Sequence, residues 1–228
     1  MFNNISNILR TDGYKPSHWL QLPPKTSKIY AYLESRGGDF PEVTWFGLNS
    51  ILKEYFSKPI TMADIDQAEK MFKNYFGTDK VFNRAGFEYI VNNYGGYWPV
   101  RIKSAPEGLT IPTRNILLSI ENTDENCAWV TTYVEGLVMK VWYTTTVATI
   151  SRNIKKLIKK YLDETGDVSG LPYKLHDFGY RGVSSEESAM LGGMSHLVNF
   201  NGSDTILGIV AAQMYYDAVN PAATIPAA

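Results

Sequence analysis

Two polar clusters carry the side chains best suited to chemistry, and the first is the run Asp177–Gly182, DFGYRG. Its two glycines allow a sharp backbone turn that presents Phe178 and Arg181 at the end of a strand. An apolar ring and a planar guanidinium together suit a flat heteroaromatic ligand that carries an anionic group. The structural alternative is that the ring only plugs the mouth of a barrel, while Arg181 pairs with Asp177 or Glu187. Spacing does not separate these interpretations.

The second cluster is the run NGSD, which ends in Asp204. A carboxylate at this position could accept hydrogen bonds from an N–H group of a ligand. The alternative is helix capping, because Ser203 and Asp204 stand directly before the apolar run TILGIV. The sequence leaves both roles open.

Two histidines lie in the same third of the chain. His196 ends a segment rich in Ala, Gly and Met, which favours a core or boundary position over catalysis. His176 directly precedes Asp177 and is the better candidate for lining a pocket. Neither histidine has a second ligand at metal-site spacing, so no metal site built from protein side chains alone is predicted. The adjacent Gly192 and Gly193 indicate close packing of a helix on a sheet rather than a phosphate-binding loop.

Strand and helix patterns alternate around both clusters. Residues 173–179 and 197–204 are typical of strands, and residues 184–197 and 205–218 are typical of helices. This β-α-β-α order is characteristic of parallel strands joined by crossover helices. Both clusters follow a strand and precede a helix, which is where the active sites of α/β barrels are built.

The chain before these repeats mixes the two patterns. Residues 28–35 alternate as in a strand, residues 46–56 indicate a helix, and residues 97–122 predict a small antiparallel β-structure. A helix capped by Thr61 and stopped by Gly77 is also expected. Its apolar face comprises Ile65, Ala68, Phe72, Tyr75 and Phe76.

Two more helices are predicted in the middle of the chain. Residues 125–142 are apolar on nearly every side, which favours one buried helix. The helix that follows should bury a face comprising Val147, Ile150, Ile154, Leu157, Ile158, Tyr161 and Leu162. Four lysines opposite this face, Lys155, Lys156, Lys159 and Lys160, predict a solvated surface.

Composition limits the class of protein. The chain has 228 residues, 22 Lys+Arg against 23 Asp+Glu, and a formal net charge of -1, so it lacks the basic excess of a nucleic-acid binder. The 44% hydrophobic content is that of a globular protein. No apolar run approaches the roughly 20 residues that cross a bilayer, and the N-terminus lacks a secretion signal, so a cytoplasmic protein is expected. The single cysteine, Cys127, is expected to be a buried structural thiol.

Several long blocks resemble one family, segment after segment and in order. They are TDGYKPSHWLQLPPKTSKIYAYLESR, PEGLTIPTRNILLSIENTD and YKLHDFGYRGVSSEESAMLGGMSHLVNFNGSDT. These blocks resemble the nicotinamide phosphoribosyltransferases, and the resemblance covers essentially the whole chain. Long matched blocks such as HDFGYRGVSS are highly specific.

The resemblance implies an α/β (α+β) fold of the type II phosphoribosyltransferase kind. Residues 1–165 would form a mixed β N-terminal region with dimer-interface loops, and residues 166–228 the first two βα units of an irregular α/β barrel. The barrel is expected to be incomplete, because two parallel strands cannot close one. The implied reaction belongs to NAD biosynthesis. Nicotinamide attacks C1 of phosphoribosyl pyrophosphate, and nicotinamide mononucleotide and pyrophosphate form, with Mg²⁺ on the pyrophosphate.

The resemblance also implies roles for individual residues on the nicotinamide side. Phe178 of one subunit and Tyr14 of the other would sandwich the pyridine ring. Asp204 would accept the carboxamide N–H, and His176 would line the tunnel beside this pocket. A carboxylate would repel an acid, so Asp204 favours nicotinamide over nicotinate.

Three further residues are implied on the ribose and phosphate side. Arg181 would line the ring and phosphoribosyl site, while Asp12 and Arg36 would reach across a homodimer interface toward ribose and phosphates. Gly13 stands where the family usually has serine, which is expected to leave the Tyr14 loop more flexible.

The family pattern continues, after the block that ends at Ala228, into a Glu-His pair whose histidine is catalytic. No catalytic residue is therefore expected in these 228 residues, which correspond to about the first half of the family. The first hypothesis is a split or truncated enzyme, active when a C-terminal half is supplied by a second polypeptide. The alternatives are an inactive remnant or an interaction or nicotinamide-binding module, and a nicotinate phosphoribosyltransferase.

Overall fold

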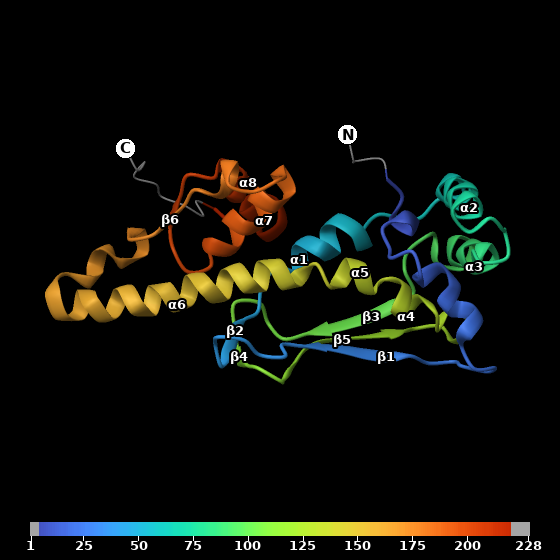
Figure 1. Cartoon of the computed structure of the whole chain (residues 1–228), viewed down its shortest axis with the longest axis horizontal. Helices are drawn as coiled ribbons and strands as arrows, with labels where there is room; N and C mark the ends of the chain where they lie inside the picture. Colours follow the sequence, from blue (N-terminus) through green and yellow to red (C-terminus); the bar gives the residue numbers. More distant parts are fainter. Residues whose placement is uncertain (1–4, 220–228) are drawn as a thin grey trace. The chain divides into compact units, whose positions relative to one another are not determined.

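The computed structural model describes residues 5–219 (Figure 1). The chain divides into two compact units that interleave along the sequence. Unit 1 comprises Met1–Leu33, Ile51–Ser104 and Ile116–Met139, and unit 2 comprises Glu34–Ser50, Ala105–Asn115 and Lys140–Ala228. The division into domains 1–165 and 166–228 stays a prediction, because these units are groups of packed segments rather than consecutive stretches of sequence.

Unit 1 contains a three-stranded sheet and most of the short helices. Its strands are β1 (Tyr30–Glu34), β5 (Ile116–Asn122) and β3 (Val100–Ser104), in the order β1-β5-β3. Its helices are η1 (Asn7–Leu9), η2 (Lys15–Gln21), η3 (Leu52–Phe56), α2 (Met62–Phe76), α3 (Arg84–Tyr94), η4 (Glu125–Cys127), α4 (Val130–Tyr133) and α5 (Glu135–Val138). The strand predicted over residues 28–35 is confirmed as β1, and the antiparallel structure within 97–122 is confirmed by the β3–β5 pair.

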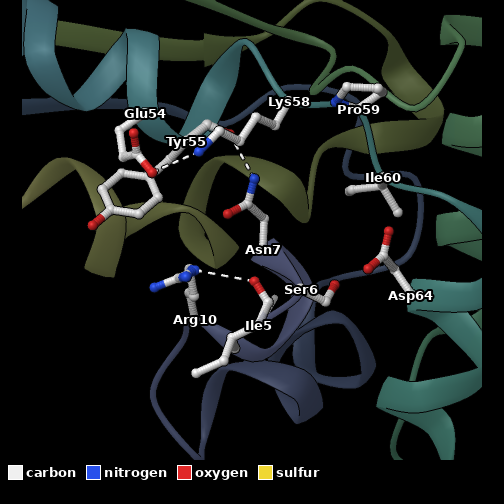
Figure 2. A pocket seen from close by; sticks show the side chains of 10 residues that line it. All are labelled: Ile5, Ser6, Asn7, Arg10, Glu54, Tyr55, Lys58, Pro59, Ile60 and Asp64. Carbon is white, nitrogen blue, oxygen red and sulfur yellow. Dashed lines mark hydrogen bonds and ion pairs between the residues drawn. The ribbon is translucent and has the colours of Figure 1, made fainter. Parts of the chain in front are cut away.

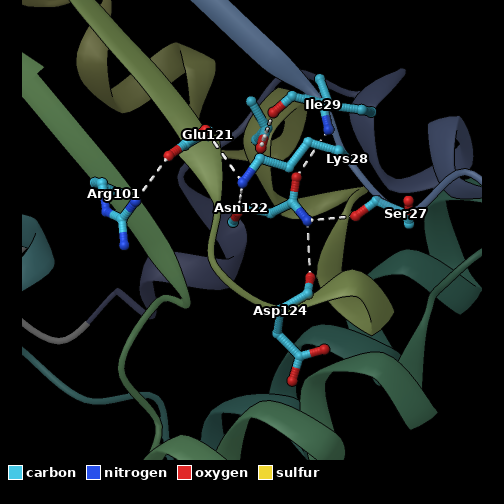
Figure 3. Close-up of polar contacts among 8 residues, drawn as sticks. Ser27, Lys28, Ile29, Arg101, Glu121, Asn122 and Asp124 are labelled. Atoms are coloured by element: carbon cyan, nitrogen blue, oxygen red, sulfur yellow. Dashed lines mark hydrogen bonds and ion pairs between the residues drawn. The ribbon is translucent and has the colours of Figure 1, made fainter.

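A buried asparagine ends the central strand of this sheet (Figure 3). The Asn122 side chain is 1% exposed, and all its polar atoms find backbone partners. Its Oδ1 accepts from the Ile29 N–H at 2.8 Å, and its Nδ2 donates to the Ser27 and Asp124 carbonyls at 2.8 Å each. Because an unpaired buried amide would be costly, these bonds fix the segment before β1 and the turn after β5.

Helix α2 begins and ends where its sequence predicts. Thr61 Oγ1 accepts from the Asp64 N–H at 3.2 Å while the Asp64 carboxylate accepts from the Thr61 N–H at 2.8 Å, which is a capping box. Gly77 ends the helix in the left-handed region at φ 70°. The assignment of Tyr75 to the buried face is wrong, because its side chain is 62% exposed and its hydroxyl lies over Gly13.

Aromatic rings form the core of unit 1. Phe87 of α3 is fully buried and stacks on Phe82 with ring centroids 5.3 Å apart. It also meets Trp129 and Tyr133 edge-on at 4.8 and 5.2 Å, the tilted geometry that aromatic pairs prefer. The Tyr133 hydroxyl donates to the Ile8 carbonyl at 2.7 Å, and burial raises its pKa.

The single buried helix predicted over residues 125–142 is wrong. The segment is buried, but it consists of η4, α4 and α5, and α6 begins only at Val141. The Asp124 carboxylate accepts from the Asn126 N–H at 2.7 Å and so starts a separate short turn. At Val134 the backbone leaves helical values, with ψ at 0°. An apolar run alone did not reveal these local breaks.

Unit 2 contains the longest helix and two small sheets. Its elements are β2 (Glu42–Thr44), α1 (Leu48–Ile51), β4 (Thr110–Pro112), α6 (Val141–Thr165), η5 (Val168–Tyr173), β6 (His176–Asp177), η6 (Gly179–Arg181), α7 (Glu186–His196), β7 (Gly202–Ser203) and α8 (Ile206–Tyr216). Strand β2 pairs antiparallel with β4, so the segment 97–122 contributes to two sheets rather than one. The helix predicted over residues 46–56 appears as α1, which continues into the π-helical turn η3.

Helix α6 does not bury its predicted face. Ile150, Leu157 and Tyr161 are exposed, whereas the buried side is lined by Val141, Thr144, Thr145, Ala148, Thr149 and Ser151. The hydroxyl groups explain this choice. Thr144 and Thr145 donate to the Phe46 carbonyl at 2.7 and 3.1 Å, and Thr149 accepts from the Thr44 N–H at 2.9 Å. Small hydroxylated side chains therefore pair with the backbone around β2.

The predicted β-α-β-α order in the last third of the chain is confirmed, with strands of only two residues each. Strands β6 and β7 pair in parallel and alternate with α7 and α8, which pack against each other. Gly193 of α7 and Gly208 of α8 meet at the crossing, where a Cβ on Gly208 would lie 2.7 Å from the Gly193 Cα. The glycine motif in α7 thus allows close packing, as predicted, but the partner at Gly193 is helix α8 rather than the predicted sheet.

Candidate functional site

The parallel pair β6–β7 brings the two polar clusters together. His176 lies opposite Gly202 and Asp177 lies opposite Ser203. Just past the pairing, the Asp204 N–H donates to the Asp177 carbonyl at 2.9 Å. The side chains that follow the two strands therefore gather at one edge, the carboxyl end of a parallel pair.

Asp204 contacts His176 instead of capping a helix. Its Oδ2 lies 3.2 Å from the His176 Nδ1, and both side chains are largely buried. Helix α8 has Thr205 at its N-cap, and no side chain there accepts a capping bond, so the capping interpretation of Asp204 is wrong. A hydrogen bond from the ring to an ionised carboxylate would require the proton on Nδ1, because a carboxylate only accepts. Oδ2 is the oxygen that contacts His176.

Phe178 and Arg181 both present exposed side chains after β6. The Phe178 ring is 48% exposed and lies nearly parallel to the His176 ring, with centroids 6.4 Å apart and planes 25° apart. Among the residues that the structure describes, no carboxylate lies within ion-pair distance of Arg181. The predicted alternative in which Arg181 pairs with Asp177 or Glu187 is therefore not observed. The Phe178 ring and the Arg181 guanidinium are thus both accessible to solvent.

Asp177 shapes the turn that carries these two side chains. Its Oδ1 accepts from the Gly179 N–H at 3.2 Å, which stabilises the start of η6. Its Oδ2 is buried and has no hydrogen-bond partner in the described part of the chain. This orphan oxygen lies beside Gly193, where an added Cβ would be 3.2 Å away. Asp177 therefore stabilises this turn through its carbonyl, which accepts from Asp204, and through its Oδ1, which accepts from Gly179.

His196 has the core position that its helix predicts. It is 5% exposed, its Nδ1 lies 2.9 Å from Ser151 Oγ, and its Nε2 lies 3.1 Å from the Leu175 carbonyl. Its ring stacks on Phe200 with centroids 5.0 Å apart. Burial lowers the pKa of His196, which keeps the ring neutral. The residue joins α6 and α7 to the start of β6.

The candidate residues near the N-terminus belong to unit 1. Tyr14 is 56% exposed, and its hydroxyl donates to the Asp12 carboxylate at 3.3 Å. The Tyr14 ring also lies under the Lys15 ammonium, 5.2 Å away, and Lys15 is buried and paired with Glu135. The Tyr14 ring also contacts the His18 ring, with centroids 5.2 Å apart, so several neighbours hold it. Arg36 belongs to unit 2 and is exposed in the irregular segment after β1.

The predicted residues therefore fall into two sets. Unit 2 carries His176, Phe178, Arg181, Asp204 and Arg36, of which the structure brings the first two and Asp204 together. Unit 1 carries Asp12 and Tyr14, which contact each other. The roles of all seven in ligand binding stay predictions.

One residue of the site was not predicted from the sequence. Gly202 lies opposite His176, and a Cβ built on it would be 2.6 Å from the His176 Cδ2 and 2.7 Å from Nε2. Only glycine leaves room for the imidazole at this distance. The signal was present in the sequence, because a glycine two residues before Asp204 lies in the predicted strand itself.

A separate pocket of about 160 Å³ lies within unit 1 (Figure 2). It is lined by Ile5, Ser6, Asn7, Arg10, Glu54, Tyr55, Lys58, Pro59, Ile60 and Asp64. Lys58 pairs with Glu54 at 2.6 Å, and Asp64 is engaged by Thr61 in the α2 cap. The pocket includes none of the candidate site residues, and its paired charges give it no evident ligand.

Three further features limit the chemistry of this chain. Across residues 5–219, no group of three or more His, Cys, Asp or Glu side chains is placed to hold a metal ion. No helix in the same range is both long and apolar enough to span a bilayer. Cys127 is buried, as predicted, and desolvation raises its pKa to about 12, which disfavours the thiolate needed of a nucleophile.

Comparison with known families gives two sequence matches. Residues 6–102 match the family described as nicotinamide phosphoribosyltransferase, N-terminal domain. Residues 173–226, which include the β6–β7 site, match the nicotinate phosphoribosyltransferase (NAPRTase) family. Both matched families are phosphoribosyltransferases, and the two matches lie before and after the long helix in the sequence.

The relatives point to one branch of this class. A nicotinamide phosphoribosyltransferase from Xanthomonas campestris pv. campestris is 47% identical over 97% of this chain and 47% of its own length. One from Mycoplasma genitalium is 30% identical over 90% of this chain and 50% of its own length. The chain carries the N-terminal domain of the nicotinamide phosphoribosyltransferases, as the resemblance indicated, and it spans about half the length of these relatives.

A solved structure supports the fold. The crystal structure of human nicotinic acid phosphoribosyltransferase superposes with a TM-score of 0.61 over 90% of this chain and 37% of the human chain, at 17% identity. The mixed α/β fold of the type II phosphoribosyltransferase N-terminal region is thereby confirmed. The predicted barrel is a finer statement that two short parallel strands neither establish nor contradict.

Proposed function

We propose that this chain is the nicotinamide-binding part of a nicotinamide phosphoribosyltransferase that acts in NAD salvage. The observation that carries the proposal is the β6–β7 edge. There the His176 ring contacts both the half-exposed ring of Phe178 and the mostly buried carboxylate of Asp204. A flat ring with a carboxamide substituent matches this set, since the ring can stack while the amide N–H donates to Asp204.

The reaction proposed for the assembled enzyme is a displacement at carbon. The pyridine nitrogen of nicotinamide attacks C1 of phosphoribosyl pyrophosphate, the bond from C1 to the pyrophosphate oxygen breaks, and pyrophosphate leaves with the electron pair. The transition state resembles an oxocarbenium ion, so the chain contributes mainly by holding the ring in line with C1. Phe178 and the Tyr14 of a second subunit would clamp the ring, and Arg181 would line the phosphoribosyl side.

Asp12 and Arg36 are proposed to reach the ribose and phosphates of the neighbouring subunit. Both side chains are exposed, as a role across an interface requires. The Arg36 guanidinium can contact phosphate oxygens with two parallel bonds. This arrangement makes a homodimer part of the proposal, together with a cytoplasmic location.

Mg²⁺ on pyrophosphate is the metal that the family resemblance implies. The described residues do not provide a ligand set for it, because no cluster of three or more potential ligands is present among them. No step of the proposed reaction is assigned to the ion. The resemblance likewise assigns the catalytic histidine to sequence that follows Ala228 in the family.

The C-terminal half of the family is proposed to complete the site. Helix α8 is apolar on all sides, yet Ile206 and Met214 are 66% and 56% exposed. Parallel sheets are normally covered on both faces, and the two-stranded sheet of β6 and β7 would need such cover. The nicotinamide phosphoribosyltransferases that match this chain are about twice as long. A C-terminal half of the same family would cover these surfaces and supply the phosphate side of the site.

The test is reconstitution. The chain is purified alone and together with a matching C-terminal half, and nicotinamide mononucleotide formation from nicotinamide and phosphoribosyl pyrophosphate is measured. Activity in the mixture supports the proposal. Failure of the mixture to turn over, when both halves are folded and associated, contradicts it, and nicotinamide binding without turnover would support the alternative of a binding module or inactive remnant.

One observation favours a second candidate, nicotinate. The segment 173–226 matches the nicotinate phosphoribosyltransferase family. The same assay with nicotinate distinguishes the two, and Asp204→Ser should improve nicotinate use if the carboxylate rejects the acid. An unchanged preference in this variant would remove the role proposed for Asp204.

A further inference from the structure

The imidazole of His176 is confined between two groups on the neighbouring strand. On one side lies the backbone of Gly202, its direct partner in the β6–β7 register. On the other side lies Asp204, whose Oδ2 is 3.2 Å from Nδ1. The three residues form a continuous set in which the ring fills the space between a glycine and a carboxylate.

Gly202 determines where the ring can lie. A Cβ at this position would be 2.6 Å from Cδ2, 2.7 Å from Nε2 and 3.0 Å from Cγ of His176, so any larger residue must displace the imidazole. The backbone of Gly202 does not have a positive φ, so space alone requires the glycine. Gly202 and its strand neighbour Ser203 are buried, which limits how far the strand can yield.

His176 in turn determines how Asp204 is oriented. Its Nδ1–H donates to Oδ2, and the two side chains are 14% and 26% exposed, so water competes little for this bond. The Asp204 backbone is fixed separately by its N–H bond to Asp177 at 2.9 Å. With backbone and Oδ2 both held, the remaining oxygen keeps one direction.

We propose that Gly202 and His176 are positioning residues that fix the Asp204 carboxylate and thereby set a preference for a pyridine carboxamide over a pyridine carboxylate. The inference rests on the proposed function, because it assigns the ligand of Asp204 to the pyridine substituent. The aimed oxygen accepts an amide N–H, whereas an acid would bring a second anion against it. If His176 is displaced, the carboxylate can turn away, and both the amide bond and the repulsion of the acid weaken.

The first test needs no ligand. Long-range ¹H–¹⁵N spectra of the full chain should show a protonated, hydrogen-bonded Nδ1 on His176. This signature should be lost in Gly202→Ala and kept in Gly166→Ala, a control whose Cβ would meet nothing closer than 3.7 Å. A His176 signature that is unchanged in folded Gly202→Ala overturns the positioning.

The second test measures binding of nicotinamide and nicotinate to the same variants by calorimetry. Gly202→Ala should reduce the ratio of nicotinamide to nicotinate affinity by about 10-fold, the size expected for losing a hydrogen bond to a charged group. His176→Asn, which keeps a donor near Nδ1, should retain more of the ratio than His176→Leu. Equal ratios in these two variants overturn the inference.

A double variant shows whether Gly202 acts through the ring. In His176→Ala the imidazole that a Cβ at position 202 would meet is gone. Adding Gly202→Ala to this variant should therefore change the ratio of nicotinamide to nicotinate affinity no further. Additive effects would mean that Gly202 acts on the strand itself and would overturn the inference. Should Gly202→Ala fail to fold, the histidine variants decide the matter alone, because they leave β7 unaltered.

The two proposals fail in different ways. If the wild-type chain binds neither pyridine in the presence of the C-terminal half, the proposed function is wrong. The ligand-free spectra then still decide whether Gly202 and His176 hold Asp204. If nicotinamide binds to wild type and to Gly202→Ala with the same preference over nicotinate, the function stands and the positioning is wrong.

Discussion

Unit 1 builds its core from large rings, whereas the helix crossing in unit 2 depends on residues without side chains. Phe87 touches Phe82, Trp98, Trp129 and Tyr133, each within 6.1 Å between ring centroids. At the α7–α8 crossing, Gly193 and Gly208 approach so closely that a Cβ would meet backbone atoms. Removing side-chain volume should therefore destabilise the ring core of unit 1, whereas adding side-chain volume should destabilise the α7–α8 crossing of unit 2. The site in unit 2 therefore lies on a scaffold with little room for substitution.

The largest effect is expected in unit 1 on removing a ring. Phe87→Ala should lower the free energy of unfolding by about 3–5 kcal/mol, because it leaves a cavity that four neighbours line. Urea denaturation measures the loss, and hydrogen exchange should rise in α2, α3 and α4. The control is Met71→Ala in α2, a half-exposed side chain that should change stability by about 0.5 kcal/mol or less. Equal losses in both variants would contradict the ring core.

The next effect is expected in unit 2 on adding one carbon. Gly208→Ala should cost about 1–3 kcal/mol, because its Cβ would lie 2.7 Å from Gly193 Cα and 2.9 Å from the Met194 nitrogen, which are backbone atoms that cannot rotate away. Hydrogen exchange over residues 186–216 measures it. Gly182→Ala is the control, since its Cβ would meet nothing closer than 3.6 Å. A stable Gly208→Ala variant would show that the two helices can move apart.

A smaller difference between the units should follow from pH. Burial lowers the pKa of His196 more than the hydrogen bond to the Leu175 carbonyl and the nearby Asp177 carboxylate raise it. The unfolded chain then binds a proton more readily than the folded one. The stabilising effect is complete above the ordinary histidine pKa near 6.5 and is lost as the pH falls.

Hydrogen exchange at a series of pH values measures this difference. Protection of α7 against exchange should fall between about pH 7.5 and pH 5.5. Protection of α2 and α3 should change less, because His18 is the only histidine of unit 1. His196→Asn should flatten the slope in unit 2. A parallel loss of protection in both units would contradict the assignment to His196.

The smallest effect concerns the Tyr14 loop. In Gly13→Ser the new Cβ would lie 2.7 Å from the Tyr75 hydroxyl, but Tyr75 is 62% exposed and can rotate toward solvent. The free energy of unfolding should change by about 0.5 kcal/mol or less. Thermal denaturation measures this, and a loss above about 1 kcal/mol would mean that Tyr75 is fixed in place.

The sequence predicted those parts of the fold that local patterns encode. The Thr61 cap, the Gly77 stop and the alternation of strands and helices after residue 173 follow from neighbouring residues, and all three were confirmed. The candidate residues Phe178, Asp204 and His176 were found because they directly follow or end a strand. Their proximity follows from parallel pairing, which the repeat order already implied.

Other parts depend on distant partners and could not be read locally. The buried face of α6 is chosen by hydrogen bonds from Thr144 and Thr145 to Phe46, about a hundred positions away. The contact of Gly202 with His176 arises only when β6 and β7 pair. The family resemblance supplied the role of Tyr14, which no pattern in the chain would have suggested.

The close contacts of the glycines have a consequence for the history of the gene. Gly192, Gly193, Gly202 and Gly208 each lie where a Cβ would fall 3.0 Å or less from another group. Most single-base changes in a glycine codon that alter the residue add a Cβ, so these four codons are among the first places where loss of selection would become visible. Sequencing the gene in closely related strains would therefore distinguish a maintained protein from a drifting copy, before any assay is run.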